Sequence, residues 1–257
     1  MFFSFVENSK MKKLVKILKV TGLGILSLIV VLMLLLVLSI PYGRNSEKPL
    51  PIPGETIPKL VFRGVNLLSM ADSLVKHNQN VYIQNGIIER IESDTTGIRE
   101  GYRIVDSEGK FMLPGLIDMH AHIFDRTDLP QYLSYGVTTV RNMMGFPMHL
   151  RWKAQLAKNE FVGSRLITAS PTLNNGNDGG PFHQDLGTPE EARNIALSHA
   201  ESGYDFFKVY DGVTLEQLKA IQSVGRETGM QIAGHPPSIT PGELLSSDLV
   251  TIEHIEE

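Results

Sequence analysis

Two histidines in the middle of the chain have the spacing of metal ligands on a strand. The segment Leu113–His122 reads LPGLIDMHAH and places His120 and His122 two residues apart at the end of an apolar run. Residues two apart on an extended strand point to the same side. Two imidazoles a few ångströms apart can bind one divalent cation through nitrogen. The pair therefore predicts a metal site, although loop histidines with no metal would show the same pattern.

Three further residues occupy corresponding places in later apolar runs. Lys208 lies inside FFKVY at 206–210, where an ammonium group without a partner would be costly to bury. His235 and His254 end the runs QIAGH and TIEH. In a parallel α/β barrel, the carboxyl ends of different strands converge on one site. We therefore expect Lys208, His235 and His254 to converge with the His-x-His pair at one site.

Two other polar residues are candidates for substrate binding. Arg141 ends the run TTVR and could bind a substrate carboxylate, but an ion pair within the fold would explain it as well. His183 ends the glycine-rich segment NNGNDGGPFH and could touch substrate, whereas a solvated loop histidine is the simpler interpretation. No Gly-Lys-Ser/Thr follows these glycines, so a phosphate-binding loop is not indicated.

The elements that must position these residues alternate between strand and helix from Leu113 onward. The expected strands are 116–119, 138–142, 165–169, 206–210, 231–233 and 251–253, and the expected helices are 129–135, 149–158, 189–202, 215–228 and 242–246. Thr188, followed by a proline and two glutamates, is a helix start signal, and Gly203 and Gly229 are placed as helix C-terminal glycines. This alternation predicts an α/β fold with a parallel sheet.

The residues before that alternation have a different texture. Between 59 and 113, short apolar runs are separated by polar or glycine turns, and alternating positions favour antiparallel strands. Asn85–Gly86 is a two-residue hairpin signal. We expect a small β domain here, at 59–113.

The N-terminus indicates a membrane anchor. Val20–Ile40 contains no ionisable residue, and at 1.5 Å per residue it reaches about 30 Å, the thickness of the bilayer hydrocarbon. Five lysines precede it, which favours a cytoplasmic N-terminus and an extracytoplasmic remainder. A cleaved signal peptide, leaving a secreted or periplasmic protein, is the alternative. Residues 1–40 are thus expected to form the cytoplasmic tip and transmembrane helix, and the proline-rich segment 41–58 a linker.

Composition narrows the classes of function. The chain has no cysteine, so disulfide scaffolds, thiolate zinc sites and cysteine nucleophiles are excluded. The net charge is −4, and no basic patch follows the anchor, which argues against a nucleic-acid partner. Whether the protein forms a homo-oligomer cannot be predicted from these features.

From residue 59 onward the sequence resembles the amidohydrolase superfamily, in particular the group of imidazolonepropionase and Xaa-Pro dipeptidases. The motifs that carry the resemblance are LPGLIDMHAHI at 113–123, YGVTTVRNMMG at 135–145, GYDFFKVYDG at 203–212, IAGHPPS at 232–238 and TIEHIEE at 251–257. The resemblance implies a (β/α)₈ barrel flanked by a small β-sandwich. The expected domains are therefore a sandwich portion at 59–113 and a partial hydrolase barrel of about six strands at 114–257.

The resemblance also implies a metal centre and a reaction. By that analogy His120 and His122 bind one divalent ion, His235 and His254 bind a second, and Lys208, carboxylated by CO₂, bridges the two. The resemblance also makes Lys208, His235 and His254 the expected catalytic residues. The ions are expected to be zinc and to activate water for hydrolysis of an amide, a cyclic amide or a dipeptide bond.

One part of the family pattern has no counterpart in the sequence. The family places an aspartate at the end of the eighth strand, and the sequence stops at Glu257, three residues after His254. We therefore expect a C-terminally truncated enzyme. Two alternatives remain open: a noncatalytic relative that binds a ligand or a subunit, and a mononuclear ring hydrolase of the imidazolonepropionase type that does not require Lys208.

Overall fold

A computed structural model describes residues 3–46, 52, 57–93, 97–176 and 182–254 of the 257-residue chain. The contacts divide the chain into two compact units, Met1–Lys48 and Pro49–Glu257. Much of the linker expected at 41–58, and part of the glycine-rich segment before His183, lie outside the described residues.

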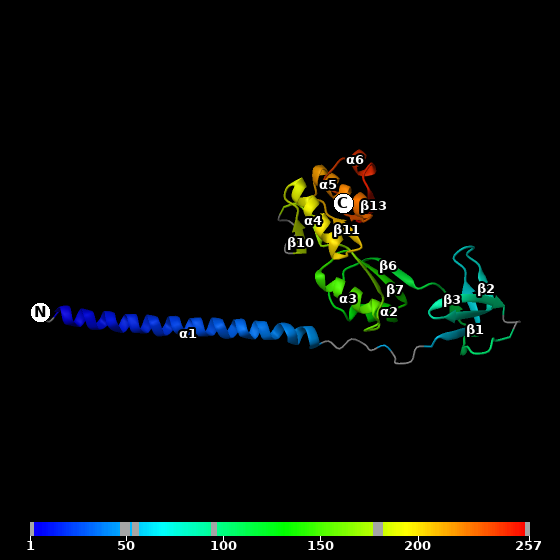
Figure 1. Cartoon of the computed structure of the whole chain (residues 1–257), viewed down its shortest axis with the longest axis horizontal. Coiled ribbons are helices and arrows are strands. Elements are labelled where there is room, and N and C mark those ends of the chain that lie inside the picture. The colour runs from blue at the N-terminus through cyan, green and yellow to red at the C-terminus, as the bar shows by residue number, and fades with distance from the viewer. Residues whose placement is uncertain (1–2, 47–51, 53–56, 94–96, 177–181, 255–257) are drawn as a thin grey trace. The chain divides into compact units, whose positions relative to one another are not determined.

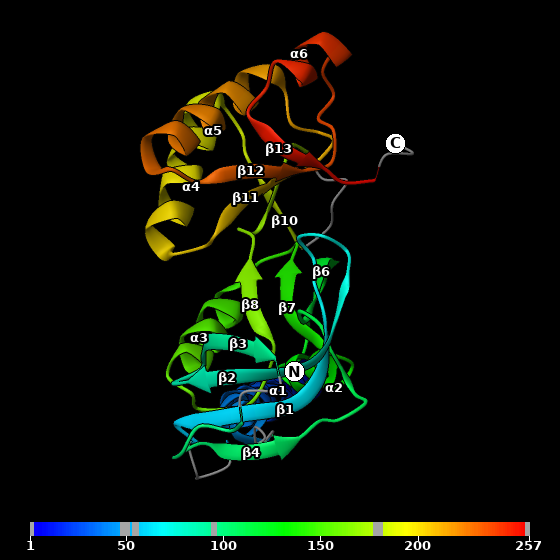
Figure 2. The same cartoon turned by 90° about the vertical axis from the view of Figure 1, so that its right-hand side faces the viewer.

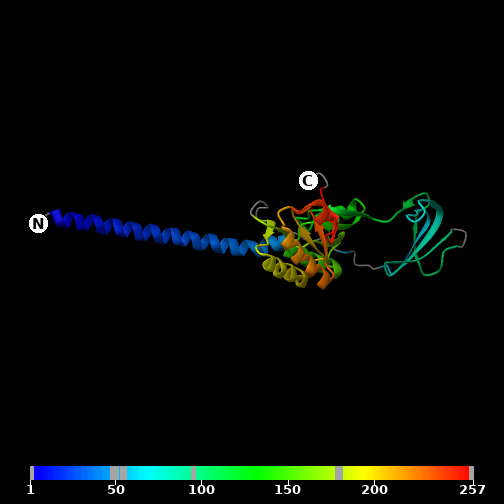
Figure 3. The ribbon, with the colours of Figure 1, turned by 90° about the horizontal axis from the view of Figure 1, so that it is seen from above.

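The first unit is the helix α1 (Phe3–Ser46), which is uninterrupted along its length (Figure 1, Figure 3). Its 25-residue stretch Val15–Ser39 is long and apolar enough to cross a membrane, and its large apolar side chains are exposed. The prediction that a linker begins at residue 41 is wrong, because α1 continues to Ser46. Nothing among the described side chains accounts for the helix passing Pro41.

The second unit begins with a small sheet. Its strands are β1 (Lys59–Leu68), β2 (Val75–Gln84), β3 (Ile87–Ser93), β4 (Arg103–Asp106) and β5 (Phe111–Met112). The order is β3-β2-β1-β4, and β5 also pairs with β1. Asn85 and Gly86 have φ values of 51° and 77°, which confirms the hairpin turn between β2 and β3. The antiparallel expectation fails for β4 and β5, because each runs parallel to β1. The described residues of this region form one sheet.

The six strands expected after residue 113 are present, each within two residues of its predicted ends. They are β6 (Leu116–Ala121), β7 (Val137–Asn142), β8 (Arg165–Thr168), β11 (Phe206–Val209), β12 (Gln231–Gly234) and β13 (Leu249–Ile252). The helices between them are α2 (Asp128–Ser134), α3 (Pro147–Ala157), α4 (Pro189–Ser202), α5 (Leu215–Thr228) and α6 (Pro241–Leu245). The strand pairs are parallel, as the alternation predicts.

The strands form two sheets in the described part of the chain, and these are not closed into a barrel. One sheet is β6-β7-β8, and the other is β10-β9-β11-β12-β13, with the additional short strands β9 (Thr172–Asn174) and β10 (His183–Asp185). A single parallel bridge between Ala169 and Phe206 links the sheets. Pro171, between β8 and β9, lacks the N–H group that a continuous ladder needs. The fold is therefore mixed α/β.

Alternation along the strands sends successive side chains to opposite faces. Phe207, Val209 and Ile232 pack in a buried cluster with residues of α4 and α5, which lie side by side along β11 and β12 (Figure 2). Ala121 and Val140 pack in a second cluster with Leu129 of α2. The residues between these positions on β6, β7, β11 and β12 therefore face away from the helices.

Candidate functional site

The candidate ligands lie on the strand faces that point away from the helices. On β6, Ala121 packs toward α2, so His120 and His122 point the other way. On β11, Phe207 and Val209 pack toward α4 and α5, so Lys208 points away from them. A run of four buried residues on β11 is typical of a parallel strand that is covered on both faces.

The four predicted metal-binding histidines gather at the carboxyl ends of three strands. The ring centroids of His120 and His122 are 5.4 Å apart, and those of His120 and His254 are 4.8 Å apart. His235 and His254 stack with centroids 4.5 Å apart. His254 has φ of 59°, a left-handed conformation of a kind that clusters at functional sites. Residues that are up to 134 positions apart in the sequence thus form one continuous row of imidazoles.

Lys208 is close to this row. Its residue is 2% exposed. Its charge contributes to the lowered pKa values of three rings, those of His122, His183 and His235. The ammonium therefore lies near enough to all three rings to act on their protonation.

The electrostatic environment keeps two of the rings neutral. Burial, then the neighbouring Lys208 and histidines, lower the pKa of His235 to about 3. Burial, then His120, Lys208 and His254, also lower the pKa of His122. Neutral imidazoles have the free nitrogen lone pair that a metal ion requires. The donor set therefore fits a divalent cation in chemical type.

The donors are not gathered around a common point. Among the described residues, no group of three or more histidines, aspartates and glutamates has the arrangement of a metal site. The histidines meet pairwise instead. His122 and His254 are exposed, whereas His235 is 6% exposed.

A charged network extends from His120. Glu253 accepts a hydrogen bond from His120 Nδ1 at 2.8 Å through its Oε2 atom. Its Oε1 atom accepts from Arg141 Nη1 at 2.9 Å and from the hydroxyl of Thr251 at 2.8 Å. Burial raises the pKa of Glu253, but the hydrogen bonds from His120, Thr251 and Arg141 outweigh it and lower the pKa to about 2. Glu253 is therefore an anion at neutral pH.

The other end of the imidazole row has aromatic and amide neighbours. The ring of Tyr210 lies between those of His235 and His183, with centroid distances of 4.0 and 4.5 Å. His183 Nδ1 lies 3.1 Å from Asn174 Nδ2. The expectation of a loop position for His183 is wrong, because the residue begins β10, which pairs with β9. This pairing brings His183 to the same strand ends as His235.

Comparisons with known proteins find partial matches among curated proteins and solved structures. No family model matches the chain. A segment of 98 residues is 31% identical to an L-hydantoinase from Paenarthrobacter aurescens, covering 34% of this chain and 21% of that protein. A segment of 66 residues is 35% identical to a dihydroorotase from Carboxydothermus hydrogenoformans, covering 26% of this chain and 15% of that protein. Among solved structures, a protein assigned as a prolidase from Bifidobacterium longum superposes with a TM-score of 0.65 and 21% identity, covering 74% of this chain and 51% of that one.

These partial similarities support the resemblance to the amidohydrolase superfamily. The chain spans about half the length of the prolidase, and its matches to the two curated relatives cover 21% and 15% of their lengths. The likeness to the prolidase, at 21% identity, shows the fold alone.

Sequence reasoning missed two residues of the candidate site. Glu253 and Thr251 bind Arg141, although the residues are more than 100 positions apart in the sequence. The sequence carried one signal for Glu253, since it is a charged residue directly before the candidate ligand His254. Of the two readings open for Arg141, the structure contains the ion pair, with Arg141 only 8% exposed.

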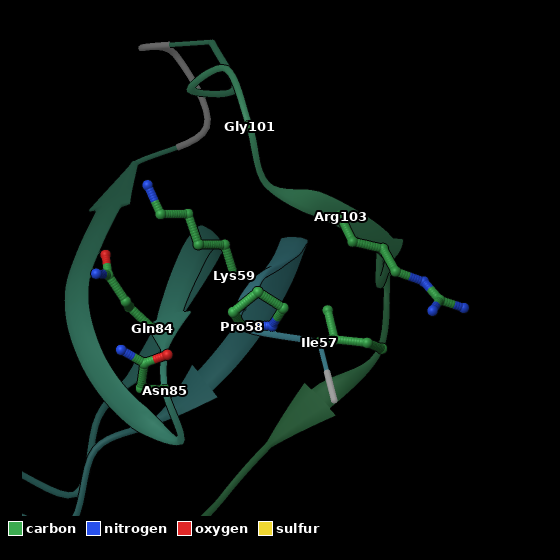
Figure 4. Close-up of a pocket in the computed structure, with 7 residues that line it drawn as sticks. All are labelled: Ile57, Pro58, Lys59, Gln84, Asn85, Gly101 and Arg103. Carbon is green, nitrogen blue, oxygen red and sulfur yellow. The ribbon is translucent and has the colours of Figure 1, made fainter. Parts of the chain in front are cut away.

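Two cavities of the protein lie away from the candidate ligands. One, of about 320 Å³, lies on the small sheet (Figure 4). Its lining consists of Ile57, Pro58, Lys59, Gln84, Asn85, Gly101 and Arg103. The other, of about 630 Å³, is lined mainly by α3, the start of β8 and the segment between them. Neither lining includes a candidate metal ligand or an acid–base pair, so neither is favoured as the active site.

Proposed function

We propose that this protein is a metal-dependent hydrolase that acts on carbon–nitrogen bonds of an amide, a cyclic amide or a dipeptide. The observation that carries the proposal is the gathering of His120, His122, His235 and His254 beside Lys208. The names of the relatives support the same class of reaction, because they include a hydantoinase and a dihydroorotase.

In this proposal the histidines divide into two pairs. His120 and His122 would hold one divalent ion, most simply zinc, and His235 and His254 would hold a second. Lys208 would add its amine to CO₂, forming a new N–C bond with loss of a proton, and the resulting carbamate would offer oxygen to both ions. When bound, the ions lower the pKa of water and polarise the scissile carbonyl. The carbamate would also replace a buried cation by an anion, which is favourable beside cationic ligands.

The residues around the pairs would bind and orient the substrate. His183 and Tyr210 lie at one end of the imidazole row, where they could contact a small amide or dipeptide. Arg141 is engaged by Glu253 and Thr251, so it would hold the site together rather than bind a substrate carboxylate.

The architecture belongs to the same proposal. The parallel strands β6 to β13 would supply part of a (β/α)₈ barrel, and the sheet at 59–113 part of a small sandwich. The helix α1 would anchor the protein as a single pass, with the N-terminus cytoplasmic and the hydrolase part outside the cytoplasm. The expected partners are the membrane and a small-molecule substrate, with no nucleic acid.

Metal analysis of the full chain tests the function. The protein, purified in detergent after expression with zinc, should carry about two ions per chain and hydrolyse amides or dipeptides from a substrate panel. His254→Gln should lower the metal content, whereas His199→Gln, on α4 outside the site, should leave it unchanged. Fewer than about one ion per wild-type chain would overturn the dinuclear centre.

The pairwise arrangement of the histidines favours a second candidate, a noncatalytic relative that binds a ligand or a subunit. It predicts a monodisperse protein that shows no hydrolysis with added metal. A mononuclear ring hydrolase predicts instead that Lys208→Ala retains full activity. Metal content and activity of Lys208→Ala, measured together, separate these outcomes from the dinuclear enzyme.

A further inference from the structure

The hydrogen bond between His120 and Glu253 joins the two sheets of the parallel-strand region. His120 lies on β6, which pairs with β7 alone among the described strands, and Glu253 follows β13, which pairs with β12 alone. The two residues are 133 positions apart, yet Nδ1 and Oε2 are 2.8 Å apart. Both side chains are largely buried, with exposed fractions of 27% and 12%. Water therefore competes weakly for this bond.

Glu253 is itself held in one orientation. Its second oxygen accepts hydrogen bonds from Arg141 and from Thr251 on its own strand. Because both oxygens are engaged by named donors, rotation of the carboxylate would break at least one of these bonds.

Arg141 is fixed in turn by β6, β11 and β13. Its guanidinium donates to the hydroxyl of Thr251 at 3.0 Å and to the carbonyl of Met119 at 3.3 Å. It also lies 4.5 Å from the ring centroid of Phe206, within the range of a cation–π interaction. A cation with this many partners acts as a rigid support for Glu253.

We propose that Glu253 is a positioning residue that holds His120 with Nδ1 protonated, so that Nε2 is offered to a metal ion, and that Arg141 fixes Glu253 for this purpose. A carboxylate can only accept, so the ring nitrogen facing it must donate. A ligating histidine that donates its other N–H to a carboxylate has a fixed tautomer and ring orientation. The role of Glu253 in metal binding rests on the proposed function, whereas its effect on the tautomer of His120 does not.

The tautomer can be measured in metal-free protein. Full chain labelled with ¹⁵N-histidine and held in detergent at pH 9 gives a two-bond ¹H–¹⁵N pattern for each ring. The signal lost in His120→Gln identifies His120. We expect a protonated Nδ1 and an unprotonated Nε2 in wild type. In Glu253→Ala the pattern should change toward a protonated Nε2. Glu253→Gln keeps a carbonyl oxygen for Nδ1–H and should restore the wild-type tautomer at least in part.

Metal affinity provides the second measurement. Competition with a chromophoric chelator should show zinc bound 10- to 100-fold more weakly by Glu253→Ala, with a smaller loss in Glu253→Gln. Glu216→Ala, an exposed glutamate in the first turn of α5, serves as the matched control and should change neither readout.

The outcomes are separable. A wild-type His120 with protonated Nε2, or a tautomer unchanged in Glu253→Ala, overturns the positioning role even if zinc binds. A wild type that binds no zinc but whose tautomer depends on Glu253 overturns the metal hydrolase and leaves the positioning role intact. If Glu253→Ala does not fold, the wild-type spectrum and Glu253→Gln still decide the question.

Discussion

Gly234 on β12 lies directly against the carbonyl of Val209 on β11. A Cβ atom added to Gly234 would lie 2.0 Å from the Val209 oxygen, and the glycine has φ of 153°. The next residue, His235, donates its backbone N–H to that same oxygen at 3.1 Å. The backbone that carries His235 is thus placed by a contact that no side chain permits.

Gly234→Ala should therefore damage the fold and the site together. The added methyl must push β12 away from β11, so we expect a loss of about 2 kcal/mol or more in the free energy of unfolding. Urea denaturation of the full chain in detergent measures this loss, and zinc binding should fall with it. Gly242→Ala is the control, because its Cβ would meet nothing within 4 Å. An unchanged urea midpoint for Gly234→Ala would show that the strands can separate without cost.

The ion pair of Arg141 should contribute far more than a surface pair of similar length. Arg141 and Glu253 are 9% and 12% exposed at their side chains, whereas Arg193 and Glu227 are 38% and 50% exposed. Removing one partner of a buried pair leaves an uncompensated charge, so Arg141→Ala should cost about 3 kcal/mol. Arg193→Ala should cost less than about 1 kcal/mol. If urea denaturation gave equal losses of unfolding free energy for Arg141→Ala and Arg193→Ala, the role of Arg141 as a support for Glu253 would be contradicted.

Asn142 should be needed for the segment that follows His122. It is fully buried, its Oδ1 atom accepts from the backbone N–H of Ile123, and its Nδ2 atom donates to Met144 and Thr168. Asn142→Ala leaves these groups without partners, and we expect a loss of about 2 to 3 kcal/mol. Hydrogen exchange at the Ile123 amide should accelerate in the variant. Glu160→Ala, in the exposed turn after α3, should change neither quantity.

His199 should make stability depend on pH. Burial lowers its pKa to about 4 from the usual 6.5. Between these two pH values the unfolded chain binds a proton at His199 that the folded chain does not. The contribution of His199 to stability is therefore fully present above pH 6.5 and is lost as the pH falls toward 4. Allowing for its partial exposure, we expect on the order of 2 kcal/mol. The difference in unfolding free energy between pH 7 and pH 4.5 should shrink in His199→Gln. It should persist in His77→Gln, an exposed position on β2.

The proposed membrane anchor can be tested by placing charged residues in the apolar stretch of α1. Leu32 and Leu35 lie in the apolar stretch of α1. An arginine at the centre of a spanning helix costs about 2.5 to 3.5 kcal/mol by insertion measurements, so Leu32→Arg with Leu35→Arg should abolish resistance to carbonate extraction. The corresponding double alanine variant should stay in the membrane fraction. Recovery of a shortened wild-type protein in the soluble fraction would favour the cleaved signal peptide.

Local signals explain why much of the fold could be predicted. Helices α4 and α5 begin and end at the predicted residues, because Thr188 and Thr214 cap their starts and Gly203 and Gly229 adopt left-handed φ at their ends. By contrast, β9 and β10 were missed. Each has three residues, too few for a periodic pattern, and they pair residues 11 positions apart in the sequence.

The sequence pointed to the candidate residues of the site, but not to the hydrogen bonds that join their neighbours. The four histidines and Lys208 were found because each ends or interrupts an apolar run, which is a local signal. The hydrogen bonds that join Glu253 to His120 and Arg141 depend on how two sheets meet, and no local pattern encodes that. The same limit explains why Arg141 had two equal interpretations until its partners were known.

The separation between His120 and Glu253 has a consequence for biosynthesis. A ribosome adds about 5 to 20 residues per second, so the 133 residues between them take roughly 7 to 27 s to make. Until then His120 lacks Glu253, and the apolar residues Leu116, Ile117 and Met119 of β6 are exposed. Because β6 pairs with β7 alone among the described strands, a chaperone or another strand can bind its other edge during this period.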